Sequence, residues 1–311
     1  MMLVLIIARS VHAPLTTRRQ LALGRVRRTL LAAMSDHGGP TGQLAPLMRH
    51  PKLIAEVLLD YAALVRGDNR ETMLIVLEAA GALRALTKGA RRGGGDRRLC
   101  LEALAVFPAE LVGSILREFL NDPSEIVRLT AATGLATIGT PLSLREIEGL
   151  SARSAVGTRT GLLRQAVLAD PAAARAAVET TAFSTNDRAT ILDSLGLAGD
   201  YPSIPILIKF QLNRDPILRA SAIMALGHLM HPDGHDAIER ALIDTHWCVR
   251  AAAAKAVGLA SFEDLVPRLE TRLRDPIWSV RLQAADALKG FGASEPLRRA
   301  TDHADLVLET V

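Results

Sequence analysis

The fold is decided by two stretches of sequence: Asp244-Thr-His-Trp-Cys-Val-Arg250-Ala-Ala-Ala-Ala-Lys-Ala-Val-Gly258 and Asp275-Pro-Ile-Trp-Ser-Val-Arg281-Leu-Gln-Ala-Ala-Asp-Ala-Leu-Lys289. Both follow the pattern Asp-x-x-Trp-x-Val-Arg-x-x-Ala-Ala-x-Ala-apolar, and their arginines lie 31 residues apart. A period of about 20 to 50 residues is typical of a solenoid, in which each unit buries its apolar face only by stacking on its neighbours. The pattern therefore predicts a repeat protein.

The same register extends toward the N-terminus in steps of 31 residues, with one step of 29, to Arg219, Arg188, Arg159, Arg128 and Arg97. The residues three and four positions after each arginine are apolar, which is the pattern of one face of an amphipathic helix. Prolines between the copies mark a second, shorter helix and the turn that joins it to the longer one. We predict about eight helix pairs from this period.

The composition agrees with an all-α fold. Hydrophobic residues make up 49% of the 311 residues and aromatic residues only 3%, with many alanines and leucines. Closely packed helices use such residues, whereas sheets favour β-branched and aromatic ones.

The formal net charge is +4, and 32 of the 37 basic residues are arginines. Arginine pairs with carboxylates or phosphates, so this bias fits internal ion pairs as well as an anionic partner. Cys100 and Cys248 give neither a disulfide framework nor a zinc-ligand spacing. Isolated cysteines fit a reducing compartment, and we expect a cytoplasmic protein.

Residues 1–38 are predicted to form a basic N-terminal helical segment. There is no acidic residue before Asp36, and the arginines considered for a membrane surface are Arg9, Arg18, Arg19, Arg25 and Arg28. Two interpretations stay open: the segment lies at the inner face of a membrane, following the positive-inside rule, or its apolar residues pack on the solenoid. The apolar run at residues 1–8 is too short to span a bilayer, which needs roughly 20 residues.

Residues 39–95 are predicted to hold degenerate helical repeats and a glycine-rich loop, and residues 96–311 the solenoid with a C-terminal cap. We expect helices over about 51–66 and 69–87, since Pro51 suits a first helical position and Asp68 or Asn69 a cap. The run Gly89-Ala-Arg-Arg-Gly-Gly-Gly95 is expected to be a linker, because it lacks the Lys-Ser/Thr ending of a phosphate-binding loop.

The units around Arg128, Arg219, Arg250 and Arg281 resemble HEAT repeats of the kind found in the phycobilisome-lyase-like group, over roughly residues 96–292. The resemblance implies a right-handed α-solenoid of antiparallel helix pairs. It also implies a ladder between neighbouring repeats, formed by the aspartate of the turn and the arginine of the second helix. These positions are Asp122 with Arg128, Asp215 with Arg219, Asp244 with Arg250, and Asp275 with Arg281. Arg97, Arg159 and Arg188 lack the preceding apolar residue, which puts the ladder in doubt there.

The C-terminal units and the basic N-terminal segment are also similar to bacterial membrane-tethered HEAT proteins. Enzymes of related fold depend on residues that are absent or scarce in this sequence. The iron-dependent HEAT hydroxylases carry His-Glu dyads, and no His-Glu pair occurs in this sequence. HEAT-like DNA glycosylases need aromatic residues on a basic face, and few are present here. A chromophore-lyase function stays open on fold analogy alone.

Three groups of residues are candidate sites. We expect the ladder to be structural, because each motif supplies its own acid. Trp247 and Trp278 occupy equivalent places, where they form either a partner anchor or a cover for the turn. His228, His231, His235 and His246 are the densest group of metal-ligand types, but Pro232 and Gly234 separate His231 from His235, so we expect no metal site.

We therefore expect a non-enzymatic scaffold with no cofactor, presenting a concave helical surface to another protein, with an anionic membrane surface as a further partner. The competing class is a nucleic-acid-binding protein or DNA glycosylase on the same scaffold.

Overall fold

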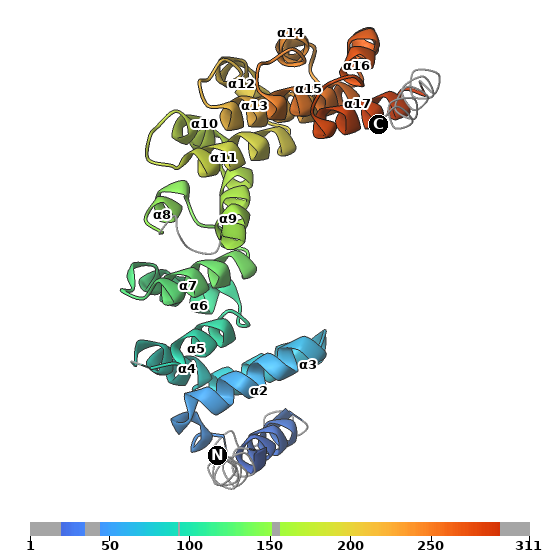
Figure 1. Ribbon diagram of the computed structural model, residues 1–311. Coiled ribbons are helices and arrows are strands. Elements are labelled where there is room, and N and C mark those ends of the chain that lie inside the picture. Colours follow the sequence, from blue (N-terminus) through green and yellow to red (C-terminus); the bar gives the residue numbers. More distant parts are fainter. Residues whose placement is uncertain (1–19, 35–43, 93, 151–155, 293–311) are drawn as a thin grey trace, which may run out of the picture. The chain divides into compact units, whose positions relative to one another are not determined.

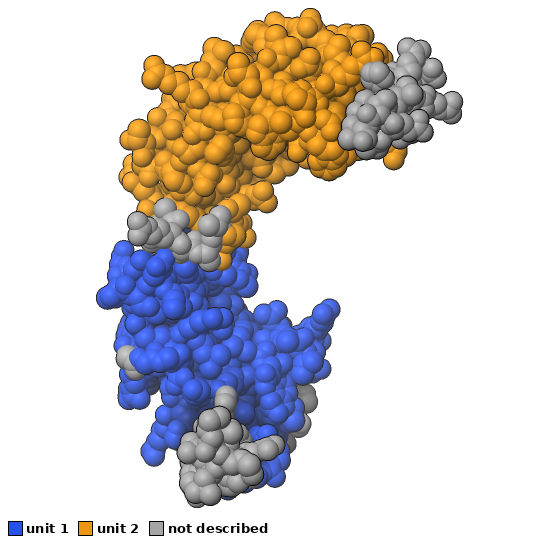
Figure 2. Space-filling view, in the orientation of Figure 1, with its two compact units in different colours: residues 1–142 blue, residues 143–311 orange. Residues whose placement is uncertain are grey.

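The computed structural model describes residues 20–34, 44–92, 94–150 and 156–292, and every regular element within these ranges is a helix (Figure 1). The chain divides into two compact units, residues 1–142 and 143–311 (Figure 2). The domain boundaries predicted near residues 38 and 95 both fall inside unit 1.

The first described helix of unit 1 covers residues 20–34, and Val26 and Leu30 are buried in it. The further α-helices of this unit are α2 (Pro51–Leu64), α3 (Asp68–Ala79), α4 (Ala82–Arg91), α5 (Arg97–Leu104), α6 (Ala109–Glu118) and α7 (Glu125–Thr137). Short 3₁₀ turns lie at Leu47–Arg49 and Phe119–Asn121. Helix α5 packs against α2, α4 and α7, so it lies in the middle of this unit.

Two glycines of unit 1, Gly81 and Gly89, have structural roles that differ from those predicted from the sequence. The single helix expected over 69–87 is two helices, α3 and α4, because the chain turns at Gly81 with a φ of 88°. The expected linker from Gly89 is helical as far as Arg91, and Gly89 and Ala90 are buried in α4. A Cβ atom on Gly89 would lie 2.7 Å from the sulfur of Cys100 and 2.8 Å from Cβ of Pro51. This glycine therefore serves close helix packing and not chain flexibility.

Unit 2 alternates short and long helices. The short helices are α8 (Leu144–Glu148), α10 (Pro171–Val178), α12 (Ile204–Phe210), α14 (His235–Ala241) and α16 (Val266–Arg272). The long helices are α9 (Val156–Ala169), α11 (Thr185–Leu197), α13 (Pro216–Leu229), α15 (Trp247–Ala260) and α17 (Trp278–Gly290). Single 3₁₀ turns precede three of the short helices, at Tyr201–Ser203, Pro232–Gly234 and Glu263–Leu265. The long helices pack in chain order, each against the next.

The helix starts are set by local sequence. Pro171 and Pro216 each take the first helical position, where the missing N–H has no intrahelical partner to lose. Side chains of Asp170 and Ser184 cap the N-termini of α10 and α11. Such a cap satisfies a backbone N–H that the helix itself leaves open. The local sequence thus explains where these helices begin.

The core is built by the positions three and four residues after each repeated arginine. Those residues are buried in every repeat except Ala285, which is half-buried: Cys100, Leu101, Ala131, Ala132, Leu162, Leu163, Ile191, Leu192, Ala222, Ile223, Ala253, Ala254 and Ala284. Small alanines in the last repeats allow the long helices to approach closely. The predicted all-α fold of stacked helix pairs is confirmed.

Candidate functional site

The repeated arginines connect neighbouring long helices through aspartate carboxylates. Arg219 on α13 donates from Nε and Nη2 to the two carboxylate oxygens of Asp244, at 2.9 and 2.8 Å. Arg250 on α15 makes the same pair of bonds to Asp275, at 2.7 and 2.9 Å. Each aspartate lies in the turn before the next long helix. These bidentate pairs therefore fasten each repeat to the following one.

The third nitrogen of each arginine holds the turn of its own repeat. Nη1 of Arg250 donates to the carbonyl oxygen of Asp244 at 2.8 Å, and Nη1 of Arg281 donates to that of Asp275 at 2.8 Å. Arg128 likewise donates to the carbonyl oxygen of Asp122 at 2.7 Å. The expected pairs, such as Asp244 with Arg250, therefore do not meet through the carboxylate of the aspartate. An arginine contacts the backbone of its own turn and the carboxylate of the next turn.

Asp215 does not belong to this ladder. The residue six positions before Arg219, equivalent to Asp244 before Arg250, is Asn213, and its carbonyl oxygen accepts from Arg219 Nη1 at 2.9 Å. Asp215 instead caps α13, since its Oδ1 accepts the N–H of Ile217 at 2.9 Å. The choice of Asp215 was wrong because it followed the nearest acid and not the repeat register.

Two further ladder pairs occur where the sequence left the ladder in doubt. Arg97 donates to the carboxylate of Asp122 through two nitrogens. Arg159 donates to both carboxylate oxygens of Asp187, at 2.9 and 3.2 Å, and this pair is buried. These pairs could have been predicted from the acid that follows Arg97 by 25 residues and Arg159 by 28 residues. The residue type before the arginine, on which the doubt was based, does not indicate whether the arginine has a partner.

The pKa values of Asp122, Asp244 and Asp275 in the ladder are lowered. The hydrogen bond from the Arg250 guanidinium lowers the pKa of Asp275 and outweighs the opposing effect of burial. The hydrogen bond from Arg97 lowers the pKa of Asp122 in the same way. A carboxylate already paired with arginine is a structural element, and the arginine paired with it is not free to bind another anion. The geometry therefore favours a structural role for these pairs.

Trp247 and Trp278 are the first residues of α15 and α17, and 43% and 63% of their respective surfaces are exposed. The ring of Trp247 stacks on His246, with centroids 6.0 Å apart. Other large apolar side chains are exposed in the same turns of consecutive repeats. We name these exposed residues collectively the turn-edge patch: Leu212, Ile217, Ile243, Trp247, Ile277 and Trp278.

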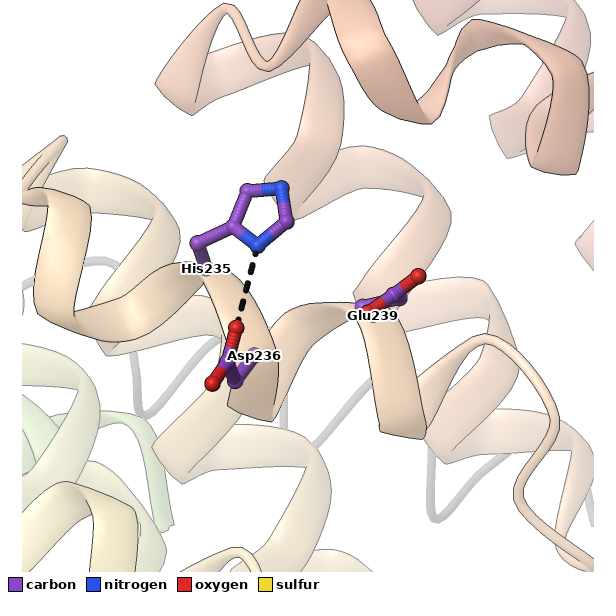
Figure 3. A group of neighbouring side chains, drawn as sticks. All are labelled: His235, Asp236 and Glu239. Atoms are coloured by element: carbon purple, nitrogen blue, oxygen red, sulfur yellow. Dashed lines mark hydrogen bonds and ion pairs between the residues drawn. The ribbon is translucent and has the colours of Figure 1, made fainter.

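The four histidines do not form one cluster. His235 lies in the first turn of α14 beside Asp236 and Glu239, and one ligand-type atom from each lies within 4.8 Å of the others (Figure 3). His235 and Glu239 also have other partners: His235 Nε2 lies 2.7 Å from Asp264, and Glu239 forms an ion pair with Arg268 at 2.6 Å. Burial lowers the pKa of His235, and hydrogen bonds to Asp264 and Asp236 outweigh it, so the pKa is raised. A raised pKa disfavours metal binding, because a metal ion must compete with the proton for the imidazole nitrogen.

The remaining histidines have local roles. His231 and His246 each accept a backbone N–H two residues onward through Nδ1, from Asp233 and Cys248 respectively. His228 lies near the end of α13. The His235 group links α14 to the turn before α16, because Asp264 belongs to the next repeat. We therefore interpret these residues as contacts within and between repeats.

Comparison with protein families gives one match. The family model described as HEAT repeats matches residues 174–258 and 236–307, which includes the alternating helices from α11 to α17. These two segments of the chain are HEAT repeats. The two matched segments lie in unit 2 and contain the Arg219–Asp244 and Arg250–Asp275 pairs of the ladder.

Comparison with solved structures gives matches of low sequence identity. Human deoxyhypusine hydroxylase in complex with glycerol is 18% identical, with 82% of this chain and 100% of that chain covered and a TM-score of 0.35. The karyopherin Kap121p, bound to the extreme C-terminus of the protein phosphatase Cdc14p, is 12% identical, with 93% and 42% covered and a TM-score of 0.42. The CpcE–CpcF complex of phycocyanin lyase from Nostoc sp. is 17% identical, with 81% and 93% covered and a TM-score of 0.30. No curated protein sequence matches the chain.

A glycine in each of three successive HEAT repeats brings the long helices together, and the sequence analysis missed this feature. Gly196, Gly227 and Gly258 lie eight residues after their repeat arginines. A Cβ atom on Gly196 would lie 2.5 Å from Cα of Ala225, and on Gly227 it would lie 2.8 Å from Cα of Ala256. The 31-residue spacing of these glycines was the signal that reveals them.

Both cysteines, Cys100 and Cys248, are free thiols. Burial raises the pKa of Cys100 to about 11 and also raises the pKa of Cys248. Because the thiolate is the reactive form, the raised pKa values lower the reactivity of both thiols.

The basic N-terminal segment is described only in part. Arg9, Arg18 and Arg19 lie outside the described residues, whereas Arg25 and Arg28 are exposed on the helix over residues 20–34. Within the described ranges, none of the helices combines the length and the hydropathy required to cross a bilayer.

Proposed function

We propose that this chain is a non-enzymatic scaffold that binds another protein along the turns of its C-terminal HEAT repeats. The observation that carries the proposal is the turn-edge patch, which exposes two tryptophans in equivalent positions of consecutive repeats. Exposed apolar side chains at regular positions on a rigid framework are typical of interaction sites. Tryptophan in particular is enriched among the residues that dominate binding energy.

The rigidity of these repeats supports the same proposal. The Asp244 and Asp275 pairs with arginine hold the turns that carry Trp247 and Trp278. A surface that is already ordered loses little conformational entropy on binding. The competing nucleic-acid function has less support, because ladder arginines are paired with carboxylates and are not available to phosphates.

Replacing Trp247 and Trp278 together with alanine is expected to weaken binding to the partner by at least about tenfold, as for two interface hot spots. The partner is first captured from the native host and identified by mass spectrometry. Its affinity for the purified protein is then measured by calorimetry. Leu168→Ala is the matched control, because this leucine on α9 is 62% exposed but lies outside the turn-edge patch.

Equal affinities for the double tryptophan variant and the wild type would contradict the patch as the binding surface. Submicromolar, salt-sensitive binding of DNA would instead favour the competing function, since non-specific binding lies near 10⁻⁴ to 10⁻⁶ M at physiological salt.

We propose in addition that the N-terminal segment contacts an anionic membrane surface. The observation behind this is that Arg25 and Arg28 point away from the buried Val26 and Leu30 on the same helix. Arg27 is engaged in an ion pair with Asp60, so it contributes less to such a surface. A basic helix face of this kind is attracted to acidic headgroups within a Debye length, about 8 Å at physiological ionic strength.

The double variant Arg25→Gln/Arg28→Gln is expected to bind phosphatidylserine vesicles about tenfold or more weakly than the wild type, since each arginine contributes about 1 kcal/mol near such a surface. Vesicle sedimentation at low and at physiological salt measures the effect. These substitutions are preferable to a truncation, which would remove Val26 and Leu30 from the core. If the double variant binds vesicles as strongly as the wild type, the proposed membrane contact of the N-terminal segment is contradicted.

A further inference from the structure

One rung of the arginine–aspartate ladder in unit 2 lacks its carboxylate. In the repeat register, Asn213 stands where Asp244 and Asp275 stand in the next two repeats. The three side chains hold their turns alike: Oδ1 of Asn213 accepts the N–H of Asp215 at 2.9 Å, and Oδ1 of Asp244 accepts the N–H of His246 at 2.7 Å. The turn is therefore preserved although the charge is lost.

The asparagine cannot complete the rung. In Asp244, the second carboxylate oxygen accepts from Nε of Arg219. The corresponding atom of Asn213 is an amide nitrogen, which carries only donors and cannot accept from a guanidinium. The arginine of this rung is Arg188, and its Nε donates instead to the carbonyl oxygen of Val178 at 2.8 Å. Within the described part of the chain, no carboxylate forms an ion pair with Arg188.

A surface pocket of about 370 Å³ lies at this incomplete rung. Its lining residues are Glu179, Arg188, Lys209, Phe210, Leu212, Asn213 and Arg214. Glu179 pairs with Lys209 at 2.6 Å, so Arg188 and Arg214 provide the excess positive charge. The guanidinium of Arg188 lies 5.3 Å from the centre of the buried Phe210 ring, which holds it in place. The volume is at the lower end of the roughly 300–1,000 Å³ typical of ligand pockets.

We propose that this pocket binds a carboxylate, with Arg188 as the principal contact. A carboxylate fits better than a phosphate, because Arg97, whose Nε likewise donates to a backbone carbonyl oxygen, holds the planar carboxylate of Asp122 by hydrogen bonds from Nη1 and Nη2. The ligand thus takes the place of the missing aspartate. If the proposed scaffold function holds, the bound carboxylate belongs to an acidic side chain of the partner protein. The existence of the carboxylate site does not depend on that function.

The test uses the full chain and two probes, a fluorescein-labelled hexaglutamate peptide and free glutarate. Asn213→Asp supplies the missing carboxylate from within, so it is expected to reduce binding of both probes by about tenfold or more and to raise the melting temperature. Arg188→Gln is expected to reduce binding equally without raising the melting temperature. Asn213→Ser keeps a turn acceptor and adds no charge, and Arg268→Gln removes an exposed arginine elsewhere in unit 2; both should bind as the wild type does.

Several outcomes would overturn the carboxylate site: no binding of either probe to the wild type at millimolar concentration, unchanged binding by Asn213→Asp, equal losses in Arg188→Gln and Arg268→Gln, or inorganic phosphate competing better than glutarate. Binding of glutarate without binding of hexaglutamate would support the site and exclude an acidic peptide as its source. The tryptophan experiment tests the scaffold function separately, so the two failures are distinguishable.

Discussion

Arg250→Ala is expected to lower the free energy of unfolding by about 3–5 kcal/mol, the range found when one partner of a buried ion pair is removed. The substitution removes both bonds to Asp275 and the bond to the carbonyl oxygen of Asp244. It also leaves the carboxylate of Asp275 buried, with its side chain only 2% exposed and Arg272 3.8 Å away as the remaining cation. Urea unfolding followed by circular dichroism measures the loss.

Arg268→Ala is the control for this variant, because its ion pair with Glu239 is largely exposed and should contribute less than about 1 kcal/mol. Equal losses in the two variants would contradict a structural ladder. The Arg250 effect should also depend on pH. The pKa of Asp275 is lowered in the folded state, so the pair stabilises the protein above the ordinary aspartate pKa of about 3.9. This stabilisation is lost as the pH falls through the lowered pKa of Asp275. The difference in the free energy of unfolding between the wild type and Arg250→Ala should therefore become smaller in this pH range.

Gly196→Ala is expected to destabilise the protein by about 1–3 kcal/mol, or more if the helices cannot separate. The new Cβ atom would lie 2.5 Å from Cα and 2.7 Å from the carbonyl oxygen of Ala225. Both atoms belong to the backbone of α13, so a side-chain rotation cannot relieve the contact. The preference of helices for alanine over glycine, about 1 kcal/mol, opposes only part of this loss. Thermal unfolding of the purified variant measures it.

The series Gly196→Ala, Gly227→Ala and Gly258→Ala should show decreasing losses, because the closest contacts of the added atom are 2.5, 2.7 and 3.0 Å. Gly161→Ala on α9 is the matched control: nothing lies within 4 Å of its Cβ position, so alanine should stabilise the helix there. Destabilisation by Gly161→Ala of the same size would show that the glycines act through the helix itself and not through close packing.

The sequence by itself determined the helices and their core. The 31-residue period and the helical spacing of apolar residues predicted the buried pairs such as Ala222 with Ile223, and prolines such as Pro216 marked the helix starts. These features depend on interactions within a few turns of chain, where residue type and spacing carry the information. The same period also contains Gly196, Gly227 and Gly258, whose role is readable once the repeats are aligned.

Only the tertiary structure decided which groups meet between repeats. The carboxylate of each arginine comes from the next turn, as with Arg219 and Asp244, because stacking places that turn beside the guanidinium. Likewise, the exposure of Trp278 and the pocket beside Arg188 and Asn213 depend on how neighbouring repeats pack. Residue spacing marks the acid 25 residues after Arg219 as a candidate, but it does not show that the two side chains meet, since that depends on how the helices of neighbouring repeats pack in space.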